Sequence, residues 1–69
     1  MIKLTEEMII SKGKSFIKFN YSDHYEYCIE KNNGILYAIQ YNKLTDCDYI
    51  ISLDSIDQSN ISLAKKHLS

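Results

Sequence analysis

Four side chains that could bind a metal ion or act in catalysis recur at every second position of one stretch: His24, Glu26, Cys28 and Glu30. Imidazole, thiolate and carboxylate groups are all zinc ligands. If the stretch is a β-strand, these side chains share a face, but neighbours lie about 7 Å apart, too far to close easily on one ion. The facing positions of the next predicted strand carry no strong ligand: Leu36, Ala38, Gln40 and Asn42. We therefore predict a half-solvated polar face with Cys28 opposite Ala38. A metal- or thiol-dependent site at His24, Glu26 and Cys28 is the alternative.

A second group of potential ligands follows further along the chain: Asp46, Cys47, Asp48, Asp54 and Asp57. A calcium loop also needs a central glycine and a closing glutamate, which this stretch lacks, so we assign the aspartates to turns and caps. A cysteine nucleophile needs a nearby base, and neither His24 nor His67 has an evident third group to orient it. Two glycines in the whole chain are too few for a phosphate-binding loop. We predict that the protein is not an enzyme and holds no metal or cofactor.

The clearest structural signal is a β-hairpin from Tyr25 to Tyr41, which positions the first group of side chains. A two-residue turn at Asn33 and Gly34 would place the apolar residues of the two strands on opposite faces. A three-residue loop at 32–34 instead places both apolar sets on one face, which favours it wherever one face is buried. We predict this loop, with four tyrosines on the buried face: Tyr25, Tyr27, Tyr37 and Tyr41.

Alternating polar and apolar residues predict four strands, at about 15–21, 24–31, 35–42 and 48–54. Residues 5–12 fit a short helix capped by Thr5, and a strand through residues 8–10 is the rival interpretation. Residues 55–69 are predicted to form a helix that begins with a capping box of Ser55 and Gln58, or with a cap at Ser59 or Asn60.

The predicted fold is therefore α+β, a four-stranded antiparallel meander with a short N-terminal helix and a C-terminal helix packed on one face. Residues 1–69 are expected to form a single small domain. A chain of this size buries only about 60 % of its unfolded surface, so its core is small. Together with an exposed sheet edge, this favours association with another protein or a homodimer.

The composition bears on the cellular location of the protein and on the kind of genome that encodes it. The N-terminal residues lack the basic start and long apolar core of a signal peptide, and the sequence has no long apolar run, so we expect a cytoplasmic protein with reduced cysteines. All eight basic residues are lysines, and arginine, tryptophan, proline and valine are absent. This bias is typical of AT-rich coding sequences, such as those of low-GC bacteria and their phages.

Charge is unevenly distributed along the chain. Residues 1–21 carry a net charge of +2, residues 22–57 a net charge of −5 and residues 58–69 a net charge of +2. The aromatic hairpin is thus the acidic part, which disfavours direct nucleic-acid binding; Lys12, Lys14 and Lys18 are the alternative basic contact. We predict a non-catalytic protein-binding module, specifically a phage or mobile-element inhibitor that presents an acidic sheet face to a basic groove of a nucleic-acid-processing host protein. The predicted partner-binding residues are all acidic: Glu26, Glu30, Asp46, Asp48 and Asp54.

Overall fold

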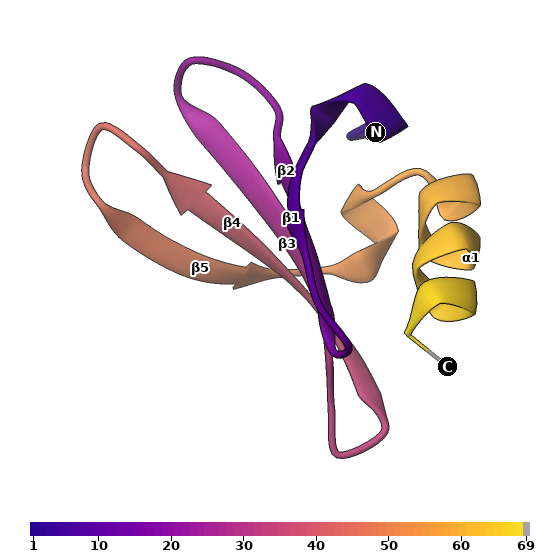
Figure 1. Cartoon of the computed structure of the whole chain (residues 1–69). Helices are drawn as coiled ribbons and strands as arrows, with labels where there is room; N and C mark the ends of the chain where they lie inside the picture. The colour runs from indigo at the N-terminus through magenta and orange to yellow at the C-terminus, as the bar shows by residue number, and fades with distance from the viewer. Residues whose placement is uncertain (69) are drawn as a thin grey trace.

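Five antiparallel strands form one sheet, in the order in which they occur in the sequence, in the computed structural model of the protein, which describes residues 1–68 (Figure 1). The strands are β1 (Ile9–Lys12), β2 (Phe16–Asn20), β3 (Tyr25–Asn32), β4 (Ile35–Asn42) and β5 (Cys47–Ile51). Two 3-10 turns, η1 (Glu6–Met8) and η2 (Leu53–Ser55), and one helix, α1 (Gln58–His67), complete the described chain. The antiparallel meander and the C-terminal helix agree with the prediction, but the sheet has five strands rather than four.

The extra strand replaces the second half of the predicted N-terminal helix. Helical structure at residues 5–12 is limited to the three residues of η1, and the Thr5 side chain makes no capping hydrogen bond. The chain then enters β1, where Ile9 pairs with Phe19 before a bulge interrupts the register. The run Met8-Ile9-Ile10 was too short to distinguish helix from strand by its pattern. Pairing with β2, a contact outside this segment, decides in favour of the strand.

The β3–β4 turn has two residues, so the predicted three-residue loop is wrong. Asn33 and Gly34 both have positive φ, at 52° and 78°, as a type I′ turn requires, and Asn32 pairs with Ile35. In this register Tyr27 faces Gln40 rather than Ile39. The polar Gln40 is accommodated because its Oε1 accepts a hydrogen bond of 2.8 Å from the Tyr27 hydroxyl.

The corrected register moves half of the hairpin's aromatic residues to the other side of the sheet. Tyr27 is buried at 4 % exposure and Tyr25 is half-buried beside the core, as predicted for that face. Tyr37 and Tyr41 pair with Glu30 and Glu26 and therefore share the face of those acids. Ala38, not Tyr37, lies opposite Ile29 in the core, and its small side chain is fully buried.

The N-cap of helix α1 lies two residues later than the earliest predicted cap, Ser55. Its N-cap is Asp57, whose Oδ1 accepts hydrogen bonds from the Ser59 backbone amide at 2.9 Å and from the Ser59 hydroxyl at 2.7 Å. Ser55 instead belongs to η2, and the last predicted helical residue, Ser69, lies outside the described residues. No helix within residues 1–68 is long and apolar enough to cross a membrane.

The core lies between α1 and one face of the sheet (Figure 1). Its buried apolar residues come from the N-terminal segment, the strands β2–β4 and the C-terminal part of the chain: Leu4, Ile17, Phe19, Tyr27, Ile29, Ala38, Ile56, Ile61, Ala64 and Leu68. Asn60 is the buried polar residue of this region; its Oδ1 accepts from the Leu4 amide at 3.0 Å, and its Nδ2 donates to the Leu4 carbonyl. The segment before β1 is therefore tied to α1, and α1 covers one face of the sheet.

Candidate interaction surface

The sheet face turned away from α1, called the open face below, is built from β2, β3, β4 and β5. Directly paired residues on neighbouring antiparallel strands point to the same side, so the register defines three rows. These rows are Glu26, Tyr41 and Asp48; Lys18, Cys28, Ile39 and Ile50; and Phe16, Glu30 and Tyr37. No helix of the described chain lies against them (Figure 1).

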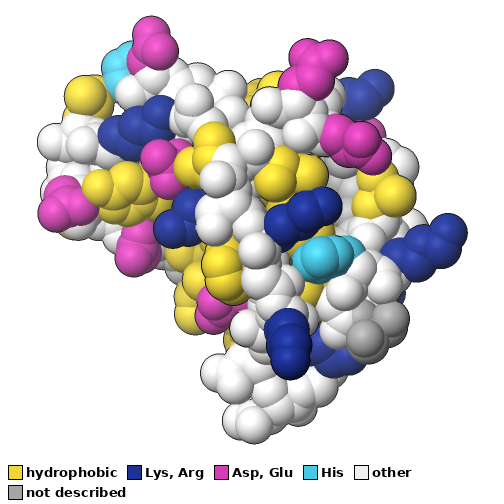
Figure 2. Space-filling view, viewed as in Figure 1, with side chains coloured by type: hydrophobic (Ala, Val, Ile, Leu, Met, Phe, Trp, Pro, Cys, Tyr) yellow, Lys and Arg dark blue, Asp and Glu magenta, His cyan; other side chains and the backbone are white. Residues whose placement is uncertain are grey.

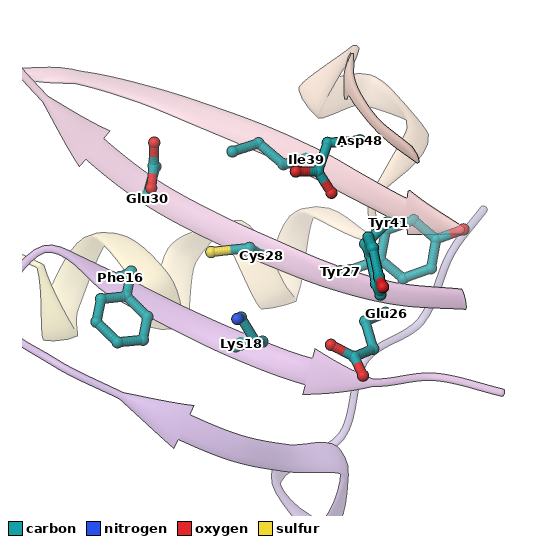
Figure 3. A pocket seen from close by; sticks show the side chains of 9 residues that line it. All are labelled: Phe16, Lys18, Glu26, Tyr27, Cys28, Glu30, Ile39, Tyr41 and Asp48. Carbon is teal, nitrogen blue, oxygen red and sulfur yellow. The ribbon is translucent and has the colours of Figure 1, made fainter. Parts of the chain in front are cut away.

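A hollow of about 570 Å³ runs along the open face and is bordered by residues of all three rows. Figure 3 shows the Cys28 thiol near its middle, with Phe16, Lys18 and Glu30 around it. Glu30 lies toward one end of the hollow, and Glu26, Tyr41 and Asp48 lie toward the opposite end (Figure 3). The surface thus combines apolar side chains with carboxylates in one shallow depression.

The charge on the open face is predominantly negative. Its rows contain three carboxylates, those of Glu26, Glu30 and Asp48, but one ammonium group, that of Lys18. Figure 2 shows the mixture of charged and apolar side chains on one side of the whole molecule. A binding partner therefore meets apolar contacts flanked by acidic groups, which suits lysine or arginine side chains.

Cys28 is a neutral thiol within this surface. Burial, followed by the negative charge of Glu30, raises its pKa, and the opposing effect of Lys18 is smaller. A raised pKa reduces the fraction of thiolate, which is the form that attacks electrophiles and binds metals. Cys28 pairs with Ile39 rather than with the predicted Ala38, and it contributes apolar surface to the hollow.

Asp46 joins one end of the open face through Tyr41. It lies in the β4–β5 turn with a left-handed backbone, φ 56°, and its Oδ1 accepts a hydrogen bond of 2.5 Å from the Tyr41 hydroxyl. This hydrogen bond is the largest contribution to a raised Tyr41 pKa, and Asp46, Glu26 and Asp48 add to it by their charge. Four of the five predicted partner-binding residues are therefore associated with the open face: Glu26, Glu30, Asp46 and Asp48.

The structure places the fifth, Asp54, elsewhere. It belongs to η2, beyond the end of β5, where its backbone amide donates to the Ser52 hydroxyl at 3.2 Å. His24 precedes β3 in an exposed turn, and its ring centre lies 6.4 Å from that of Tyr25. Within residues 1–68, no three His, Cys, Asp or Glu side chains are grouped so that they could hold a metal ion.

The three lysines of the alternative basic contact do not share one face. Lys18 lies on the open face, whereas Lys12 pairs with Ile17, which faces the core. Lys14 lies in the connection between β1 and β2. The acidic residues Glu26, Glu30 and Asp48 therefore share one face of the sheet, whereas these three lysines do not.

The sequence patterns did not predict the apolar part of the open face. Phe16, Tyr37, Ile39, Tyr41 and Ile50 belong to it. The dipeptide Asn33-Gly34, which strongly favours a two-residue type I′ turn, was the signal that identifies this register. Comparisons with protein-family models, with curated proteins and with solved structures find no match to this chain, so the interpretation of the surface rests on its own geometry.

Proposed function

We propose that the chain is a non-catalytic protein-binding module and that its open face docks on a basic surface of another protein. The observation that supports this proposal most directly is the position of Glu26, Glu30 and Asp48 on a sheet face that no helix covers. They surround a partly exposed apolar strip formed by Tyr37, Ile39 and Ile50. Interfaces between proteins commonly have an apolar, aromatic-rich centre and a polar rim.

The apolar strip supplies the centre of such an interface. Ile39 and Tyr37 are half-buried, and Ile50 remains 73 % exposed. Covering these side chains with a partner removes apolar area from water, at about 25 cal/mol for each Å². Tyrosine suits this position because it combines a large contact area with a polar hydroxyl.

The carboxylates supply orientation and attraction. They lie at both ends of the hollow, so lysine or arginine side chains from a partner can meet them while the partner's apolar atoms cover Cys28 and Ile39. Complementary charge mainly accelerates association and excludes wrong partners. A basic groove that ordinarily binds nucleic acid offers this complementary charge, which is why we favour a nucleic-acid-processing protein of the cytoplasm as the partner. The composition of the chain favours a phage or mobile element as its source.

The experiment begins with identification of the partner by capture from the native host, followed by titration of the purified pair. The double variant Glu26→Lys, Glu30→Lys is expected to weaken binding by at least about tenfold and to reduce the dependence of affinity on salt. Asp54→Lys is the matched control, because it changes the charge of an exposed acid that lies off the open face.

Retention of full affinity by the double variant would overturn the assignment of the open face. Equal weakening by Asp54→Lys would show that overall charge, rather than this face, controls binding. Circular dichroism of all variants establishes that each remains folded.

A further inference from the structure

The two edges of the sheet differ in how well they are protected against pairing with another strand. The edge strand β1 is interrupted by a bulge between Ile9 and Ser11 and ends at Lys12. Bulges and lysines are common devices that prevent edge-to-edge association. The other edge strand, β5, pairs with β4 in an uninterrupted register over five residues and contains no lysine.

The backbone alternation identifies which groups of β5 point outward. Successive residues of an antiparallel strand direct their N–H and C=O groups to opposite sides. The Lys31 amide donates to the Ser15 carbonyl on the β2 side at 2.8 Å, so Glu30 and Cys28 direct their backbone groups toward β4. Their partners, Tyr37 and Ile39, consequently direct theirs toward β3.

The remaining residues of β4 then face β5. Ala38 and Gln40 direct their backbone groups toward their partners Ile51 and Tyr49. Asp48 and Ile50, which alternate with those partners, therefore present their N–H and C=O groups to the outside of the sheet. Within the described chain, no backbone hydrogen bond from outside β4 reaches these groups.

Two side chains of β5 are also apolar and exposed, one on each face of the sheet. Ile50 is 73 % exposed on the open face, and Tyr49 is 56 % exposed on the face of α1. Neither side chain belongs to the core or to the partly buried residues packed against it. The strand thus offers unpaired backbone groups together with two uncovered apolar side chains.

We propose that β5 pairs antiparallel with β5 of a second copy of this chain, about a two-fold axis that passes between the two Ile50 residues. Each Ile50 then exchanges two backbone hydrogen bonds with its counterpart. Each Tyr49 lies opposite Ile51 of the other copy, and each Asp48 lies opposite Ser52. A register centred on Asp48 would instead place two carboxylates directly opposite each other, which is unfavourable.

This symmetry gives a continuous sheet in which both α1 helices lie on one side and both open faces lie on the other. The homodimer expected from the sequence thereby acquires a defined edge and register. Ile50 belongs to both the edge and the open face, but the proposal does not depend on the partner protein proposed above, because it concerns the backbone groups of the edge and is tested by self-association of the purified chain.

The test measures the mass of the full chain by sedimentation equilibrium over a range from about 1 µM to 1 mM. We expect a dimer that dissociates on dilution, and we expect Ile50→Lys to shift the dissociation constant by at least about tenfold, because two lysines would face each other at the axis. Leu63→Lys is the matched control: Leu63 is 55 % exposed on α1, away from β5. Circular dichroism shows whether each variant is folded.

A monomer throughout this concentration range would overturn the proposal, as would a dimer that Ile50→Lys and Leu63→Lys leave equally intact. The register is tested separately in a Cys28→Ser, Cys47→Ser background. Under oxidation, Ile50→Cys is expected to form a disulfide across the axis, because directly paired residues lie within the distance a disulfide spans. Ser52→Cys is not expected to do so, and efficient crosslinking of Ser52→Cys alone would refute this register.

Discussion

The hydroxyl of Tyr41 on β4 donates a hydrogen bond of 2.5 Å to Asp46 in the turn that follows the strand. This bond connects an aromatic residue of the open face to a carboxylate that lies outside the sheet. It also holds the pKa of Tyr41 above the ordinary tyrosine value, because ionisation would place a phenolate beside the negatively charged Asp46. Glu26 and Asp48 raise this pKa further.

Asp46→Asn is expected to lower the pKa of Tyr41 toward its ordinary value, since the amide carries no negative charge. NMR titration of the tyrosine ring carbons measures this change, and Asp54→Asn is the control. Because the folded pKa is raised, the neutral phenol stabilises the fold fully below about pH 10, and this stabilisation is lost as the pH rises through the folded pKa. An unchanged Tyr41 pKa in Asp46→Asn would contradict the assignment.

Asn60→Ala is expected to reduce the free energy of unfolding by about 2–4 kcal/mol, because it leaves two backbone groups of Leu4 without their partner in a buried region. Urea denaturation monitored by circular dichroism measures the loss. Ser62→Ala on the exposed side of the same helix should change stability by less than about 0.5 kcal/mol. Alanine has a higher helix propensity than asparagine or serine, so propensity would stabilise both variants rather than destabilise them. A loss in Ser62→Ala as large as that in Asn60→Ala would contradict the importance of the Leu4 contact.

Asn33→Val tests the two-residue turn. Asn33 has a φ of 52°, a conformation that a β-branched residue adopts poorly, so the substitution should cost about 1–2 kcal/mol. Asn32→Val alters the preceding asparagine, which is the last residue of β3, and should cost far less. Thermal unfolding compares the two variants, and equal costs would argue for a different turn.

The two cysteines should differ in their reaction with a disulfide reagent such as Ellman's reagent near pH 7.5. Both are free thiols, but Cys47 is exposed, whereas Cys28 is half-buried and has a raised pKa. We expect Cys47 to react at least about tenfold faster. Measuring Cys28→Ser and Cys47→Ser separately assigns each rate, and a faster reaction at Cys28 would show that its thiol is accessible and ionised.

The hairpin shows how far sequence patterns determine this fold. The predicted strands at 24–31 and 35–42 nearly coincide with β3 and β4 because alternation and the Asn-Gly dipeptide define them locally. The register failed because β4 is apolar on both faces: Leu36 and Ala38 point toward the core, and Tyr37 and Ile39 point away from it. Alternation alone does not identify the buried side of such a strand.

The sequence predicted the acidic residues of the open face but not its apolar residues. Glu26, Glu30 and Asp48 do share a face, but the aromatic residues beside them were assigned to the core. The position of Asp54 depends on where β5 ends, and the strand stops at Ile51 rather than at the predicted residue 54. Likewise, Asp57 caps α1 in place of the candidate residues because η2 intervenes and delays the start of the helix. These details depend on contacts between segments distant in sequence.

The contact between Leu4 and Asn60 spans 56 positions of the chain, and Ile2 forms a parallel bridge with Ile56 close by. During synthesis, the ribosome must therefore release Asn60 before Leu4 can reach the side chain that binds it. The strands β1 to β4 pair with neighbours that emerge soon after them, whereas Ile2 and Leu4 have to wait until residues 56–60 have emerged. We expect Ile2 and Leu4 to dock after β1 to β4 have paired, and a nascent chain stalled before residue 56 to expose them to chaperones and proteases.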